Sequence, residues 1–256
     1  MDGATADTMV LERAFFGVSA LLFAASAAAT IVWCTSMSAM DGMPMPEQTW
    51  TGAAGSFLGM WVVMMVAMML PSLVPKLWRY RQAVRRMGES RLGGLTALLG
   101  IAYFSVWTVF GVAAFALGVG LTAIEMQQPA LARAAPVAVG MVVVIAGVLQ
   151  FTEWKACHLA YCRQAPGRGL ALPAVAGAAW RQGVRLGLHC GRCCVGLMAI
   201  LLVTGVMDLR AMAVVTAAIT VERVAPGGER VARAIGAVAV GTGLFLIARA
   251  AATAWG

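Results

Sequence analysis

The sequence has few charged residues and few side chains that could perform acid–base catalysis. Only 12% of its 256 residues are charged, whereas an average globular chain has about 25%. It contains two histidines and three tyrosines. No glycine-rich loop followed by lysine is present to cradle a phosphate, and no Ser-His-Asp arrangement occurs. These absences argue against an ATP-driven machine and a hydrolase, and we expect a protein that is not an enzyme.

Apolar residues dominate what is present. They make up 61% of the chain, and the mean hydropathy is +0.84. This composition excludes a disordered chain, a disulfide-stapled miniprotein and a soluble α/β enzyme. A helix needs about 20 apolar residues to cross a bilayer. We therefore predict an all-α, polytopic membrane helix bundle that forms one domain over residues 1–256, with apolar runs at 14–33, 52–75, 94–124, 134–151, 193–209, 212–224 and 231–255.

The number of crossings is predicted to lie between five and seven. Seven runs are present, but those at 193–209 and 212–224 are close to the minimum length. If these two form one re-entrant hairpin, five crossings remain. Pro71 and Pro75 lie at the end of the second run, and we expect them to break its last turn.

The distribution of basic residues predicts the orientation. The net charge is +8, and 16 of the 19 basic residues fall on one predicted side. Only Arg133, Arg210 and Arg249 fall on the other. By the positive-inside rule, the N-terminus is cytoplasmic, the C-terminus lies outside, and the membrane is the cell (plasma or inner) membrane. The lipid bilayer thus accounts for the positive charge, and no nucleic-acid partner is expected.

Methionines concentrate in one part of the chain. Nine of the 17 lie between residues 37 and 69, in the first outside loop and the second apolar run. Thioethers at short spacing favour Cu(I), a soft ion that prefers soft sulfur ligands. The alternative is packing, because methionine fills irregular gaps well. Within the second run, Met60, Met64 and Met68 recur every fourth residue, which predicts a stripe along one face of a helix. The candidate ligands are Met37, Met40, Met43 and Met45 in the loop and Met64 and Met68 in the run.

The densest group of potential ligands lies within residues 189–194, at the predicted cytoplasmic entrance to the fifth run. In a helix, Cys190, Cys194 and Met198 share one face, and His189 and Cys193 form a second pair one turn apart. Two ligands one turn apart can reach a single ion. The spacing therefore suits Cu(I), with zinc as a further possibility.

A second group, Cys157, His158 and Cys162, falls on the same predicted side. Reducing conditions in the cytoplasm disfavour structural disulfides, so free thiols or a metal site are expected. Simple packing of cysteines and a redox-active thiol pair are the alternatives. Glu222 lies near this side, either as a group that supports or ligates a metal or as a local ion-pair partner.

Several short blocks together resemble a known family. They occupy residues 61–71, 187–198, 205–208 and 222–226, together with Met212. The combination is similar to a bacterial family of predicted metal-binding integral membrane proteins, filed as a domain of unknown function, and covers about residues 50–230. The resemblance implies a polytopic fold and a set of candidate metal ligands, namely Cys157, Cys162, Cys190, Cys193, Cys194 and Glu222.

These observations favour a copper-handling membrane protein over two alternatives. In the leading hypothesis, the outside methionines capture Cu(I), the second run relays it, and the Cys/His groups hold it inside; the reverse direction fits the same residues. The first alternative is a non-catalytic structural or assembly subunit of a larger membrane enzyme, such as a copper-dependent monooxygenase or oxidase. The second is a thiol redox protein. Membrane enzyme subunits or further copies of the chain are the expected protein partners.

Overall fold

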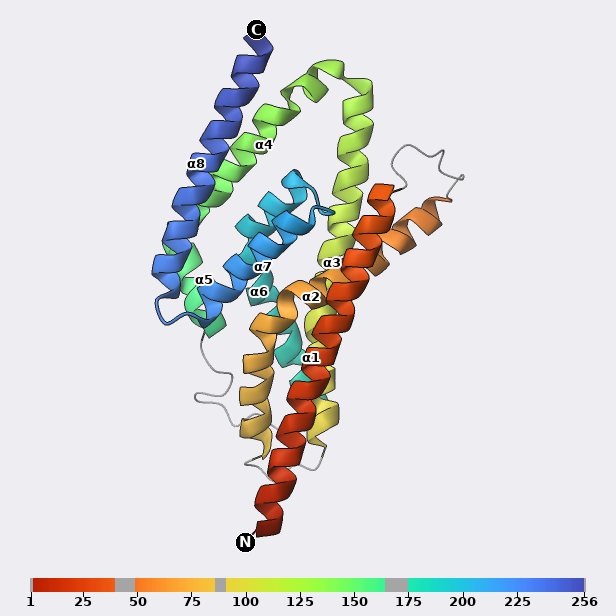
Figure 1. Ribbon diagram of the computed structural model, residues 1–256, viewed down its shortest axis with the longest axis vertical. Coiled ribbons are helices and arrows are strands. Elements are labelled where there is room, and N and C mark those ends of the chain that lie inside the picture. Colours follow the sequence, from red (N-terminus) through yellow and green to blue (C-terminus); the bar gives the residue numbers. More distant parts are fainter. Residues whose placement is uncertain (1, 40–48, 86–90, 164–174, 256) are drawn as a thin grey trace.

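The computed structural model describes residues 2–39, 49–85, 91–163 and 175–255, and within these residues the structure is helical with no strand. This confirms the predicted all-α bundle (Figure 1). The helices in these ranges are α1 (Asp2–Ala39), α2 (Trp50–Arg85), α3 (Leu92–Gln127), α4 (Pro129–Leu149), α5 (Glu153–Arg163), α6 (Ala176–Thr204), α7 (Leu209–Val224) and α8 (Gly228–Trp255).

Five of these helices, α1, α2, α3, α6 and α8, are long and apolar enough to cross a membrane. Helices α4 and α5 meet at an angle of 66° and together could supply a sixth crossing. Helix α7 has only 16 residues, fewer than the roughly 20 that a crossing requires. The chain is thus a helical bundle compatible with a multi-pass membrane protein, and its five or six candidate crossings fall within the predicted range.

Helix α2 does not end at its prolines. The expectation that Pro71 and Pro75 break the last turn is wrong, because the helix continues to Arg85. A proline inside a helix removes one backbone hydrogen bond and clashes with the preceding turn, which bends a helix that packing holds together. Figure 1 shows the α2 ribbon changing direction partway along its length.

Helix α6 begins well before the predicted start of the fifth run. It starts at Ala176 rather than at residue 193, so the Cys/His segment lies in the middle of a helix and not at its entrance. Arg181, Arg185 and Arg192 lower the hydropathy of its first half, but all three are exposed. The opposite face, with Gly183 and Cys190, is buried.

Glycines set how closely two helix pairs approach. In the α4–α8 pair, a β-carbon on Gly147 would lie 2.9 Å from the Gly236 carbonyl oxygen. In the α3–α6 pair, a β-carbon on Gly187 would lie 3.0 Å from the Tyr103 carbonyl oxygen. Small residues at such positions let backbones pack closely in a membrane, where the hydrophobic effect does not drive association. The close α3–α6 contact brings Tyr103 to the cysteine face of α6.

The main buried core lies among α2, α3, α6 and α7, with α1 contributing at its edge. In Figure 1, α4 and α8 run side by side on one flank, and α6 and α7 lie between that flank and α1–α3. The end of the bundle where α1 begins is called the lower end, and the end where α1 finishes is called the upper end. The core contains most of the buried sulfur atoms described next.

Candidate metal centre

The methionines of α2 face the interior of the bundle. The structure buries five of them, and Met64, Met65 and Met69 are at most 1% exposed. The stripe predicted from the four-residue spacing therefore points at other helices and not at lipid. Its members are Met60, Met64, Met65, Met68 and Met69, and all but Met60 pack with α3, α6 and α7 in the main core.

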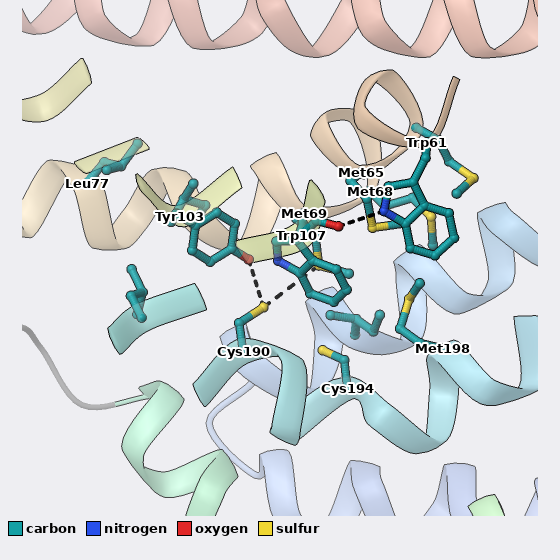
Figure 2. Close-up of a cluster of buried hydrophobic side chains, with 14 of the residues drawn as sticks. Trp61, Met65, Met68, Met69, Leu77, Tyr103, Trp107, Cys190, Cys194 and Met198 are labelled. Atoms are coloured by element: carbon teal, nitrogen blue, oxygen red, sulfur yellow. Dashed lines mark hydrogen bonds between the residues drawn. The ribbon is translucent and has the colours of Figure 1, made fainter. Parts of the chain in front are cut away.

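Cys190 and Cys194 of α6 lie opposite this methionine stripe. Both are buried, and they lie one helical turn apart on the same face of α6. The Cys190 sulfur is 4.0 Å from the Met69 sulfur and 2.7 Å from the Tyr103 hydroxyl oxygen. Figure 2 shows Cys190 and Cys194 on one helix, with Met69 and Tyr103 approaching from two others. Helices α6 and α2 thus bring two thiols and a thioether together, and α3 adds the Tyr103 hydroxyl. We call Met69, Cys190 and Cys194 the sulfur centre.

Arg223 of α7 completes this arrangement. Its Nη2 atom is 2.6 Å from the Cys194 sulfur and 3.1 Å from the Cys190 sulfur. Its Nη1 atom donates to the Ser72 hydroxyl at 3.0 Å. A buried charge is costly unless it is paired and hydrogen-bonded. A guanidinium that contacts two sulfurs stabilises the thiolate form, which is the form that ligates metals.

Cys193 connects the two cysteine groups of the sequence. It directly precedes Cys194 on α6 and packs with Cys162 of α5 in a small buried cluster. The Cys162 thiol of α5 also lies 3.6 Å from the His189 carbonyl oxygen. A row of sulfur atoms therefore runs from Cys162 through α6 to Met69 of α2.

A buried ion pair lies beside this row. The Lys155 ammonium is 2.8 Å from Oε2 of Glu222 and also donates to the Cys193 carbonyl oxygen at 2.7 Å. The Gln150 side-chain amide donates to Oε1 of Glu222 at 3.1 Å. Glu222 is thus an ion-pair partner, as one of its two predicted roles required. Its partner is Lys155 of α5 and not the adjacent Arg223.

The two imidazoles lie apart from the sulfur centre. His189 stacks on Tyr161 with ring centroids 3.7 Å apart, and its ring is 6.0 Å from that of His158. His158 in turn bonds the Trp154 carbonyl oxygen through Nδ1 at 2.8 Å. Cys157 is exposed and separate. Within the described ranges, no three Cys, His, Asp or Glu side chains are arranged as a metal site.

The predicted outside methionines cannot be placed. Met40, Met43 and Met45 lie outside the described residues, as does the side chain of Met37. Nearby at the upper end, a cavity of about 460 Å³ is lined by Cys34, Met207 and Asp208 among others. Cys34 is at the end of α1, and Met207 and Asp208 form the turn between α6 and α7. This cavity is a second place where sulfur side chains from separate parts of the chain meet, one from α1 and one from the α6–α7 turn.

Three residues around the sulfur row were not predicted as part of the site. Tyr103 and Arg223 contact the sulfur centre directly, and Lys155 pairs with Glu222. Polar and charged side chains inside membrane helices are costly and usually functional. Tyr103 in the middle of a long apolar run carried that signal. Arg223 carried no comparable signal, because a sequence does not show which face of α7 is buried.

A comparison with protein families now gives these contacts a context. No curated protein and no solved structure matches the chain. A family model described as PpoB2, a copper chaperone, matches residues 58–246, about three quarters of the sequence. The match includes α2 from residue 58 onward, the cysteine segments of α5 and α6, and Arg223 of α7. It confirms the resemblance to a metal-related bacterial family, and the chain belongs to the PpoB2 family of copper chaperones.

Proposed function

We propose that this chain binds Cu(I) at the sulfur centre, inside the membrane, and passes it on as a copper chaperone. The observation that supports this most directly is the convergence of the Cys190 and Cys194 sulfurs on one nitrogen of Arg223. The Met69 sulfur lies within 4.0 Å of Cys190 on the side of α2. Two thiolates and a thioether therefore need only small side-chain movements to share one ion.

The chemistry of this donor set suits Cu(I) better than zinc. Cu(I) prefers soft thiolate and thioether ligands, and the sulfur centre offers two thiols and one thioether. Structural zinc sites normally have four ligands in a tetrahedron, usually from Cys and His. The imidazoles of His158 and His189 lie in a separate contact beside Tyr161 of α5. We therefore assign the sulfur centre to Cu(I) and leave zinc as the competing ion to be tested.

The row of buried sulfurs offers a route along which copper could move. From the upper end, the stripe Met60, Met64 and Met68 descends α2 toward Met69, and the cysteines of α6 continue the row to Cys162 of α5. Soft ligands of similar type spaced along a route let Cu(I) exchange from one to the next without changing its oxidation state. The cavity lined by Cys34 and Met207 gives the upper end of this route a place where copper could be accepted or released.

The recipient is proposed to be a copper-dependent enzyme of the membrane or of the compartment outside. The family is described as copper chaperones, a role that needs a partner to receive the metal and no catalytic site in this chain. An assembly role within such an enzyme is the alternative that the sequence left open. Transient, copper-dependent association with the recipient would support delivery, whereas permanent co-purification irrespective of copper would support a structural subunit.

The experiment that tests the proposal is a Cu(I) titration of the purified full chain in detergent. The protein competes with a chromogenic Cu(I) chelator under reducing conditions, and bound copper is counted per chain. We expect the Cys190→Ser/Cys194→Ser double variant to lose at least about 100-fold in affinity, equivalent to about 2.7 kcal/mol. Cys157→Ser is the matched control, because this cysteine is exposed and outside the sulfur row.

A second double variant separates the two candidate sites. His158→Ala/His189→Ala removes both imidazoles and leaves the sulfur centre intact. The proposal expects copper binding close to that of the unmodified chain. Wild-type affinity in the cysteine variant, with loss in the histidine variant, would instead place the ion at the imidazoles.

A further inference from the structure

A cation already occupies the space between the two thiols of the sulfur centre. Nη2 of Arg223 contacts both sulfurs, and the residue is only 7% exposed. A site that receives a metal cation would not be expected to hold a permanent positive charge, since arginine stays protonated in proteins. We therefore ask which charge on the bound ion is compatible with a permanent positive charge at Arg223.

The charges of the site balance for a monovalent ion. Cys190 and Cys194 as thiolates carry two negative charges, and Arg223 offsets one of them. Bound Cu(I) then gives a neutral assembly, whereas Zn(II) or Cu(II) leaves one uncompensated positive charge. An uncompensated charge in the low-dielectric interior of a membrane protein is strongly unfavourable.

The other charged groups near Arg223 do not alter this balance. Lys155 and Glu222 form a pair with no net charge. Lys76 of α2 is also buried and acts electrostatically on Arg223 and on Cys162, Cys190 and Cys193. A thiolate at Cys162 or Cys193, outside the sulfur centre, would offset its charge. The remaining partners of the guanidinium, the Ser72 hydroxyl and the Cys190 carbonyl oxygen, are neutral. Arg223 is therefore the only cation described here with hydrogen bonds to the sulfurs of Cys190 and Cys194.

We propose that Arg223 is a specificity-determining residue that makes the sulfur centre selective for monovalent soft cations. In the metal-free chain its N–H group bridges the two sulfurs. When Cu(I) binds, two Cu–S bonds replace the two N–H···S contacts, and any protons still on the thiols pass to water. Copper remains Cu(I) throughout, and Arg223 stays beside the site as the counter-charge. This inference rests on the proposed copper binding at the same residues.

The test measures the ratio of Cu(I) to Zn(II) affinity in the full chain, with Ag(I) as a redox-inert monovalent probe. Arg223→Gln removes the positive charge and keeps a hydrogen-bond donor. We expect the ratio of monovalent to Zn(II) affinity to fall at least about tenfold, equivalent to 1.4 kcal/mol. Arg223→Lys keeps the charge and is expected to keep the ratio. Arg210→Gln, at the exposed start of the same helix, is the control.

A second variant tests the same charge if Arg223→Gln does not fold. Ser72→Asp places a carboxylate against the same guanidinium and neutralises it in place, because Ser72 already accepts a hydrogen bond from Nη1. It is expected to lower the ratio in the same direction. An unchanged ratio in either folded variant overturns the role of Arg223. Failure of the unmodified chain to bind Cu(I) or Ag(I) would instead overturn the proposed function.

Discussion

Two regions of the bundle are both apolar, but they differ in what their helices bury against each other. Helices α4 and α8 meet through glycines, and a β-carbon on Gly147 or Gly243 would press on the backbone of the facing helix. Helices α2, α3, α6 and α7 enclose methionines, cysteines, Tyr103 and Arg223. The first region gains stability from close backbone packing alone. The second buries polar and sulfur groups at a cost, which is the usual mark of a functional site in a membrane protein.

The largest expected effect comes from breaking the link between these regions. Gln150, which directly follows α4, and Lys155 of α5 both hold the carboxylate of Glu222 on α7. Glu222→Gln leaves the Lys155 ammonium buried without its counter-charge, which typically costs about 3–5 kcal/mol. We expect a large fall in the thermal unfolding temperature in detergent. Glu229→Gln, an exposed change at the start of α8, is the control, and an equal effect from both would show that the pair contributes little.

The next prediction compares one glycine from each region. Gly147→Ala in α4 and Gly187→Ala in α6 both place a methyl group against facing backbone, and overpacking of this kind costs about 1–3 kcal/mol. Both variants should unfold at lower temperature. Only Gly187→Ala should also weaken Cu(I) binding, because it displaces the α3 segment that carries Tyr103.

Gly177→Ala is the control for both changes, since a β-carbon there meets no atom within 4 Å. Equal losses of Cu(I) affinity in the α4 and α6 variants would contradict the division of the bundle into a packing region and a metal region.

The smallest predicted effect tests the thioether. Met69→Leu keeps the volume of a buried side chain and removes the sulfur 4.0 Å from Cys190. Volume-conserving swaps of this type usually cost less than about 1.5 kcal/mol of stability. We expect little change in unfolding temperature and a loss of about tenfold in Cu(I) affinity, equivalent to about 1.4 kcal/mol. Met141→Leu, on the exposed side of α4, should change neither.

The fold could be predicted in outline because long apolar runs have few other uses. The helix boundaries could not be predicted where charged residues or prolines lie inside a helix. Three exposed arginines lower the mean hydropathy of the first half of α6, so this half was not predicted as part of the helix. Mean hydropathy combines all faces of a helix, whereas in the bundle one face is buried and another is exposed. Pro71 and Pro75 predicted the end of α2. The helix continues because residues beyond the prolines, among them Tyr80 and Val84, are buried against other helices.

The candidate site was predictable only in part, for a similar reason. Helical spacing correctly placed Cys190 and Cys194 on one face, and the methionine stripe on one side of α2. Which faces of two helices meet depends on the rotation of each helix about its axis. For α3 and α6, this rotation is set by their close packing at Gly183 and Gly187. Spacing within one segment could not show that Arg223, on a different helix, points between the two thiols.

X-ray absorption spectroscopy of the full chain loaded with one Cu(I) tests the central claim most directly. The account predicts a copper ion bound by sulfur alone, with two or three Cu–S contacts. The Cys190→Ser/Cys194→Ser variant should lose this signature, and Cys157→Ser should retain it. A spectrum dominated by nitrogen ligands in the unmodified chain, unchanged by the cysteine substitutions, would place copper at the imidazoles and contradict the account.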